Sequence, residues 1–150
     1  MDTSDTVLRA IPHRPPFLFV DKVLEMRDDG ATTQFTVRED LDFFAGHYPG
    51  NPIMPGVIIC EAVFQSAAVF LLEKYSKDYN KKKVTPVLGR ILNARFREIV
   101  KPGNVLTIDV SIKEKVGMFF MCRGVAKNGD KRSLNIEYTL ALKTEEQADQ

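Results

Sequence analysis

One histidine and one glutamate flank the point where a Gly/Pro-rich turn meets an apolar segment. His47 follows Gly46 in that turn, and Glu61 lies fourteen residues later, inside the apolar run Val57–Leu72. An imidazole and a carboxylate can exchange protons near neutral pH, and a helix that begins between them offers free backbone N–H groups to an anion. A base, an acid and an anion-binding helix end are sufficient to remove a proton beside a carbonyl and to expel a leaving group.

The apolar run predicts a buried helix. Pro55 suits a first helical position, and apolar residues surround the helix almost completely through Leu72. Glu61 and Gln65 are four residues apart, so their polar groups share one helix face. A structural carboxylate bonded to backbone donors is the alternative. Because an unpaired buried carboxylate is costly, we favour a functional role for Glu61.

Other polar or reactive groups near this segment have simpler interpretations. Gly56 and Val57 lie in the first helical turn, where backbone N–H groups lack helical partners and can bind an anion, although Gly56 could serve the turn alone. Cys60 could pair with a histidine as a nucleophile, but an inert buried thiol is the better interpretation. His13 is expected to anchor the N-terminal loop together with Arg14.

The remaining pattern predicts a single α+β domain over residues 1–150, with residues 1–10 and 144–150 loosely ordered. Residues 38–54 form a long connection, which in a compact domain is usually functional. A short helix is expected over Thr6–Ala10, capped by Asp5, and Asn128-Gly129 predicts a type I′ hairpin turn. Strand-like runs cover Phe17–Arg27, Ala31–Val37, Thr85–Arg97, Asn104–Val116, Met118–Lys127 and Lys131–Lys143.

The simplest architecture for these elements is a curved antiparallel sheet wrapped around one helix. One sheet cannot cover a helix on all sides, and the strand Met118–Met121 is also apolar. A homodimer would supply the missing surface.

Composition excludes several classes of protein. The 150 residues are 44% hydrophobic and 27% charged with a net charge of +1, which gives no case for nucleic-acid binding. Cys60 and Cys122 lie far apart, form no metal-ligand spacing and suit a reducing compartment. The polar N-terminus is no signal peptide, and Val57–Leu72 is shorter than the ~20 residues of a membrane span. We expect a cytosolic protein.

At these residues the chain resembles the β-hydroxyacyl-[acyl carrier protein] dehydratases of the FabZ type, which have the hotdog fold. The resemblance extends from Ile11 to Leu142. The segments that carry it are Ile11–Asp21, Gly46–Gly50, Pro55–Val57, Glu61-Ala62 with Gln65, Ala94–Phe96 and Pro102-Gly103. Tyr48, Phe64 and Glu98 depart from the family pattern, where phenylalanine, a smaller residue and often a basic residue are usual.

The resemblance implies dehydration of a (3R)-hydroxyacyl-acyl carrier protein to the trans-2-enoyl product, without metal or organic cofactor. His47 and Glu61 match the catalytic pair, and Gly56 matches the glycine whose N–H holds the thioester carbonyl, with Val57 and Gln65 expected beside the substrate. Glu61 stands where dehydratase–isomerases carry Asp, which favours dehydration without isomerisation. Family members are similar in forming dimers with sites shared between subunits, often as trimers of dimers.

Three basic residues, Arg95, Arg97 and Lys101, are candidates for docking an acidic carrier protein, with Glu98 on the opposite face of the strand. The simpler interpretation is a row of outward strand positions. Two other functions stay open: a hotdog thioesterase that hydrolyses the same thioester, and a non-catalytic acyl-binding subunit.

Overall fold

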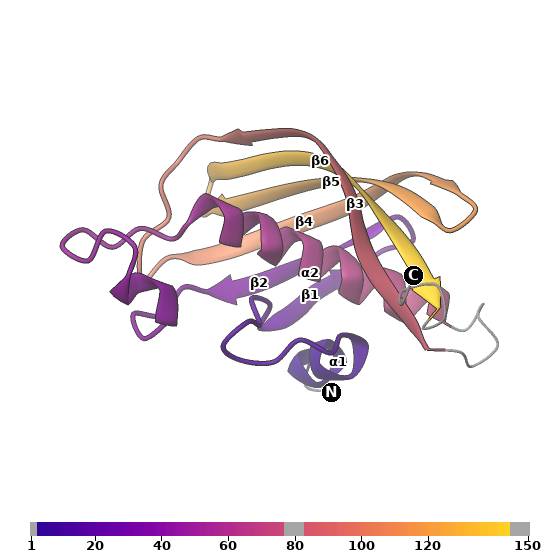
Figure 1. Ribbon diagram of the computed structural model, residues 1–150, viewed down its shortest axis with the longest axis horizontal. Helices are drawn as coiled ribbons and strands as arrows, with labels where there is room; N and C mark the ends of the chain where they lie inside the picture. Colours follow the sequence, from indigo (N-terminus) through magenta and orange to yellow (C-terminus); the bar gives the residue numbers. More distant parts are fainter. Residues whose placement is uncertain (1–2, 77–82, 145–150) are drawn as a thin grey trace.

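The computed structural model describes residues 3–76 and 83–144. Its elements in chain order are α1 (Thr3–Ala10), β1 (Lys22–Met26), β2 (Gly30–Thr36), the 3₁₀ helix η1 (Asp42–Ala45), α2 (Gly56–Tyr75), β3 (Val84–Phe96), β4 (Val105–Val116), β5 (Phe119–Asn128) and β6 (Lys131–Thr144) (Figure 1).

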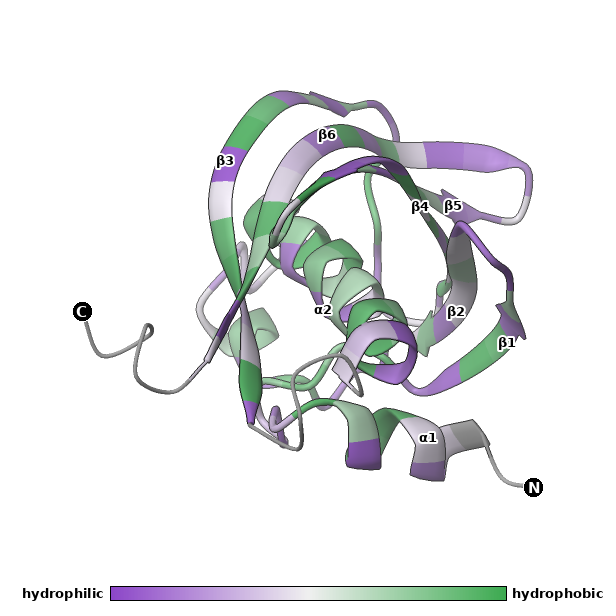
Figure 2. Cartoon of the chain, turned by 90° about the vertical axis from the view of Figure 1, so that its right-hand side faces the viewer, coloured by the Kyte–Doolittle hydropathy of each residue, from purple (hydrophilic) through white to green (hydrophobic). Residues whose placement is uncertain are grey.

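The six strands form one antiparallel sheet in the order β1-β2-β4-β5-β6-β3. After β2 the chain passes through α2 to β3 at the far edge, then returns to β4 in the middle of the sheet. The sheet curves around α2, and α1 lies outside the open side of the curve (Figure 2). The predicted architecture is therefore observed.

Helix α2 forms the centre of the core. Its residues from Ile59 to Leu72 are buried except Glu61, so it contacts the protein on nearly all sides. Pro55 is the N-cap residue rather than the first helical residue, so the helix begins one residue later than predicted. By length and composition α2 could cross a membrane, contrary to the estimate from the shorter apolar run, but 67% of its most apolar window is buried inside the protein. Burial in a curved sheet identifies it as a core helix.

The N-terminal region differs from the prediction in two ways. The short helix predicted over Thr6–Ala10 is present but begins earlier, as α1 from Thr3, and its Val7 is buried in the core. Asp5 lies in the first turn of this helix and is not its cap. The predicted strand Phe17–Arg27 is reduced to β1, because the backbone of Phe17 and Phe19 bonds to the Gln65 side chain of α2 and not to a neighbouring strand.

The hairpin between β5 and β6 has a different turn from the predicted type I′. Asn128 pairs with Lys131, so the loop residues are Gly129 and Asp130. Gly129 has φ 62°, whereas Tyr48 is the one non-glycine residue with positive φ among the described residues. A glycine with positive φ at the first central position alone is the pattern of a type II′ turn. The other strands lie within a residue or two of the predicted ranges.

Candidate active site

His47 lies in the connection between β2 and α2, just after η1. Its Nδ1 is 2.8 Å from the carbonyl oxygen of Ile53. A carbonyl oxygen can only accept, so Nδ1 carries the proton and Nε2 presents a lone pair. The local hydrogen bond thus holds the imidazole in the tautomer that a general base requires. The ring of Tyr48 contacts the imidazole edge-to-face, with centroids 4.7 Å apart.

Glu61 is held by a hydrogen bond along its own helix. Gln65 Nε2 donates to Glu61 Oε1 at 3.2 Å and also to the Phe17 carbonyl at 3.1 Å. The Phe19 N–H donates to Gln65 Oε1 at 2.7 Å. The buried Gln65 amide therefore donates both of its hydrogens to protein oxygens. Its bonds to the Phe17 carbonyl and the Phe19 N–H take the place of hydrogen bonds to a neighbouring strand. This gives Gln65 a role in placing Glu61, while its predicted substrate contact stays a prediction.

His13 also lies beside Glu61, which the sequence analysis did not predict. The distance from His13 Nε2 to Glu61 Oε1 is 3.7 Å. Of the expected anchoring pair, only Arg14 anchors the loop, through its guanidinium bonds to the Leu8, Ile11 and His13 carbonyls. The available signal was that His13 is one of only two histidines in the chain.

The beginning of α2 has the geometry expected of an anion site. The first helical hydrogen bonds run from the N–H groups of Ile58 and Ile59 to the Pro55 carbonyl, at 2.9 and 3.1 Å. The N–H groups of Gly56 and Val57 precede these bonds, and the Val57 side chain is exposed. A Cβ atom at Gly56 would come within 2.8 Å of the Phe96 ring, so the close approach of that ring requires glycine.

Two separate cavities flank the first turns of α2. One of about 110 Å³ is lined by His13, Glu61, Phe64, Gln65, Ala68, Pro86, Leu88 and Leu140. The other, of about 270 Å³, is lined by Ile53, Met54, Gly56, Ile59 and Phe96–Val100.

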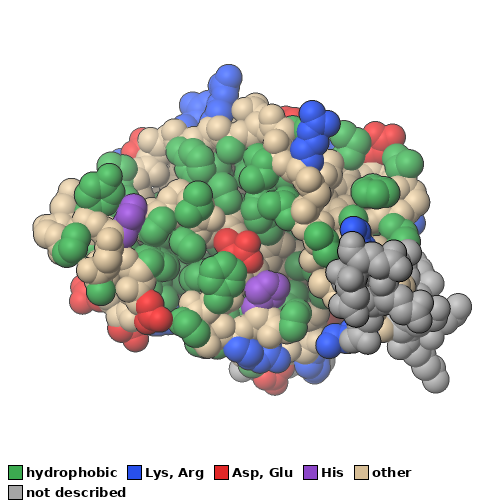
Figure 3. All heavy atoms as spheres, viewed as in Figure 1, with side chains coloured by type: hydrophobic (Ala, Val, Ile, Leu, Met, Phe, Trp, Pro, Cys, Tyr) green, Lys and Arg blue, Asp and Glu red, His purple; other side chains and the backbone are tan. Residues whose placement is uncertain are grey.

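His47 is not among the described residues that line either cavity. The two histidine side chains of the chain lie apart on one face, with hydrophobic side chains between them (Figure 3). A single chain therefore brings Glu61 to His13 and does not bring it to His47.

Cys60 has the properties of an inert thiol. It is buried and free, and burial raises the pKa of the Cys60 thiol above its ordinary value, which disfavours the nucleophilic thiolate. Burial likewise raises the pKa of Cys122 to about 12. These directions support the interpretation of both thiols as structural.

The basic residues proposed for docking have different surroundings. Arg95 and Arg97 are exposed, and Arg97 and Glu98 both line the cavity at Gly56; the placement of Glu98 on the opposite face stays a prediction. Strand β3 ends at Phe96, and the Arg97 N–H still donates to the Ser133 carbonyl of β6 at 3.0 Å. Lys101 lines a different groove, together with Glu39, Asp40 and Asp42. Those carboxylates leave Lys101 in an acidic environment.

The chain is similar in sequence to a family model and to curated dehydratases. A family model described as a FabA-like domain matches residues 11–137. A 3-hydroxyacyl-[acyl-carrier-protein] dehydratase FabZ of Caulobacter sp. (strain K31) is 38% identical over 135 residues, covering 88% of this chain and 80% of the relative. Its counterpart in Clostridium acetobutylicum is 35% identical over 141 residues, covering 92% and 96%.

Solved structures share the fold at low sequence identity. The dehydratase heterocomplex ApeI:P from Xenorhabdus doucetiae matches with a TM-score of 0.80 and 18% identity, covering 95% of this chain and 94% of that one. A hypothetical thioesterase with coenzyme A from Streptococcus pneumoniae TIGR4 matches with a TM-score of 0.64 and 13% identity, covering 93% of each chain. These likenesses support the hotdog architecture alone.

Proposed function

Because this chain belongs to the family of FabZ-type 3-hydroxyacyl-[acyl-carrier-protein] dehydratases, which are hydro-lyases, we propose that it removes water from a (3R)-hydroxyacyl thioester on acyl carrier protein in fatty-acid or related lipid biosynthesis. The observation that supports His47 as the catalytic base is its tautomer, with the proton on Nδ1. Its Nδ1–H is engaged by the Ile53 carbonyl, so Nε2 is available as a base.

The proposed mechanism uses three groups. His47 Nε2 removes the α-proton, and negative charge develops on the thioester oxygen. The Gly56 N–H and the N-terminal end of α2 stabilise that oxygen, an effect worth on the order of 10²–10³ in rate. Glu61, directly or through a water molecule, protonates the departing β-hydroxyl. The products are the trans-2-enoyl thioester and water, and no step requires a metal or organic cofactor.

We propose that the two groups meet across a homodimer. Within one chain, the described residues that line the Glu61 cavity do not include His47, so a His47 that acts together with Glu61 would come from a partner subunit. Strand β3 is a sheet edge that pairs only with β6 in the described part of the chain. Leu88, Ile91, Leu92 and Phe96 of this strand are each more than 40% exposed. An exposed apolar edge strand favours pairing with a second copy, and dimers of this kind could associate further into trimers of dimers.

This interface differs in position from the one suggested by the sequence. The predicted contact strand Met118–Met121 carries exposed Phe119 and Met121, but these lie in and beside a hairpin away from Glu61. Pairing through β3 would instead place the partner beside Leu88, which lines the Glu61 cavity. We also propose a cytosolic location, supported by the two free cysteines.

A two-channel assay tests the reaction class. With a 3-hydroxyacyl-acyl carrier protein, a dehydratase should produce enoyl absorbance with no release of free carrier thiol. Thiol release at a comparable rate would instead indicate a thioesterase. Product in neither channel, under conditions where acyl-carrier binding is observed, would indicate a non-catalytic acyl-binding subunit.

The carrier-docking proposal concerns Arg95 and Arg97. Both are exposed, and Arg97 lines the cavity at Gly56, where the carrier arm would enter. Changing both to Glu should raise KM for carrier-bound substrate about 10-fold or more and reduce its dependence on salt, because charge steers acidic partners.

A small thioester without the carrier is the control substrate for this double variant, and its turnover should barely change. An equal loss on both substrates would assign the two arginines to the fold or the reaction site. Lys101→Glu is a matched variant, expected to have the smaller effect because Lys101 lies among carboxylates.

A further inference from the structure

We propose that His13 is a positioning residue for Glu61: its Nε2–H and the Gln65 amide together direct Glu61 Oε1 toward the protein, which leaves Oε2 for proton transfer to the substrate. The inference rests on the proposed function, in which Glu61 is the acid. It assigns a task to the second histidine of the chain, which the proposed mechanism does not use.

The first support is the geometry around the carboxylate. Gln65 Nε2 is 3.2 Å from Glu61 Oε1, and His13 Nε2 is 3.7 Å from the same oxygen. Both nitrogens therefore approach one oxygen of the carboxylate. At 3.7 Å the histidine contact is longer than a hydrogen bond, and the proposed bond requires a small rotation of either side chain to shorten it.

The second support is the environment of the imidazole. His13 Nδ1 is buried and has no hydrogen-bond partner among the described residues. A proton on Nδ1 would therefore be a buried donor without an acceptor, which is unfavourable. Of the two tautomers of the neutral ring, the one with its proton on Nε2, the nitrogen that faces Glu61, is therefore better accommodated.

The third support is the composition of the cavity. Among the described residues that line the cavity, only His13 and Glu61 are titratable; the others are Gln65 and apolar residues from α2, β3 and β6. Cys60, next to Glu61 in α2, is buried and its thiol pKa is raised, so it adds no charge near neutral pH. In such surroundings a polar pair interacts more strongly than it would in water.

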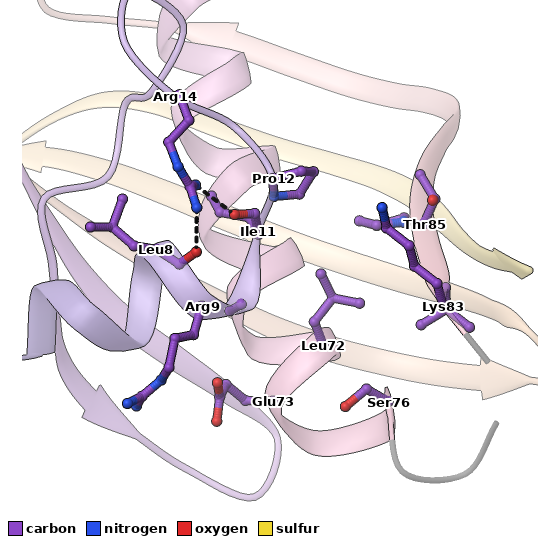
Figure 4. Close-up of a pocket in the computed structure, with 13 residues that line it drawn as sticks. Leu8, Arg9, Ile11, Pro12, Arg14, Leu72, Glu73, Ser76, Lys83 and Thr85 are labelled. Atoms are coloured by element: carbon purple, nitrogen blue, oxygen red, sulfur yellow. Dashed lines mark hydrogen bonds between the residues drawn. The ribbon is translucent and has the colours of Figure 1, made fainter. Parts of the chain in front are cut away.

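The fourth support is the anchoring of the loop that carries His13. Arg14 points back toward α1, where its guanidinium donates to the Leu8 carbonyl at 2.8 Å and to the Ile11 carbonyl at 2.9 Å (Figure 4). A further bond joins it to the His13 carbonyl at 2.6 Å. The Arg14 side chain thus links the backbone at His13 to the end of α1, which restricts the positions that the His13 ring can take.

Three substitutions at this position separate a donor from a space-filling role. His13→Leu keeps the bulk and removes the donor, and kcat should fall about 10-fold with KM changed less than about 2-fold, because a misplaced acid impairs the chemical step. His13→Gln can place an amide N–H near the position of Nε2 and should recover kcat to within about 3-fold of the wild type. His13→Asn has the same amide on a shorter side chain and should behave like the leucine variant.

Coupling to Glu61 decides the matter. In a Glu61→Gln background, His13→Leu should cost almost nothing further, because the carboxylate that it positions is gone. An equal cost of His13→Leu in both backgrounds, or equal activities of the Gln and Asn variants, would overturn the inference. If His13→Leu does not fold, the Gln and Asn comparison alone gives the answer.

The same set separates this inference from the proposed function. Near wild-type activity of Glu61→Gln alone would reject Glu61 as the acid. An inactive Glu61→Gln with a fully active His13→Leu would reject only the role of His13.

Discussion

Replacing His47 by Ala or Glu61 by Gln should each lower kcat for dehydration by about 10²–10⁴-fold, the usual contribution of one acid or base. The Nδ1–H of His47 donates to the Ile53 carbonyl, so the lone pair of Nε2 is free to accept a proton. Alanine removes the imidazole and with it this base. Glutamine at position 61 keeps the shape of the glutamate side chain and leaves Gln65 unchanged. Its amide is not acidic, so it cannot protonate the departing hydroxyl. Enoyl absorbance under substrate saturation is the measurement.

The matched control is Glu73→Gln, which changes an exposed carboxylate on the same helix. Its kcat should equal that of the wild type within about 2-fold, since surface substitutions rarely matter. Thermal midpoints and chromatographic sizes of all three variants should match the wild type. Near wild-type turnover of either the His47 or the Glu61 variant would remove that residue from the mechanism.

Co-expression of the two inactive chains should restore activity. A mixed dimer of His47→Ala and Glu61→Gln subunits has one site with both substitutions and one site with neither. Random pairing yields mixed dimers in about half of the population, and half of their sites are intact, so about one quarter of wild-type activity is expected. Two affinity tags allow the mixed dimer to be purified, and about half of wild-type activity per dimer should then be measured.

The outcome that contradicts the shared site is equally clear. A verified mixed dimer with no more activity than either parent would place His47 and Glu61 in the same subunit. The single chain argues for sharing, because the described residues lining the Glu61 cavity do not include His47. Two differently tagged Glu61→Gln chains, co-expressed and purified in the same way, are the control, and they should show no rescue since no subunit supplies Glu61.

Local patterns in the chain were sufficient to predict most elements. The apolar circumference of Val57–Leu72 predicted a buried helix, and α2 is that helix. The strands from β3 to β6 followed from β-rich runs separated by Gly and Pro, because such signals are short-range. Two local predictions failed where tertiary contacts took over: Phe17 and Phe19 bond to the Gln65 side chain of α2 instead of a strand, and the β5–β6 turn is displaced by one residue.

The pair His47 and Glu61 was proposed from residue types and spacing. The contact of His13 with Glu61 could not be predicted in this way. Glu61 and Gln65 share a face because helical periodicity requires it, and the bond at 3.2 Å between them follows. The approach of His13 to Glu61 depends on how a loop 48 residues earlier in the chain crosses α2. No periodicity relates residues so far apart.

The sequence by itself therefore determined the type of element at most positions, the family and the chemistry that the residue types allow. Only the tertiary structure decided which groups meet: it placed His13 at Glu61, kept His47 out of that cavity, put Lys101 in a groove that Glu39, Asp40 and Asp42 also line, and left β3 exposed at an edge. The physical reason is the distance along the chain over which each kind of interaction acts. Propensity and periodicity act over a few residues, whereas these contacts result from the closure of a curved sheet around a helix by packing between distant segments.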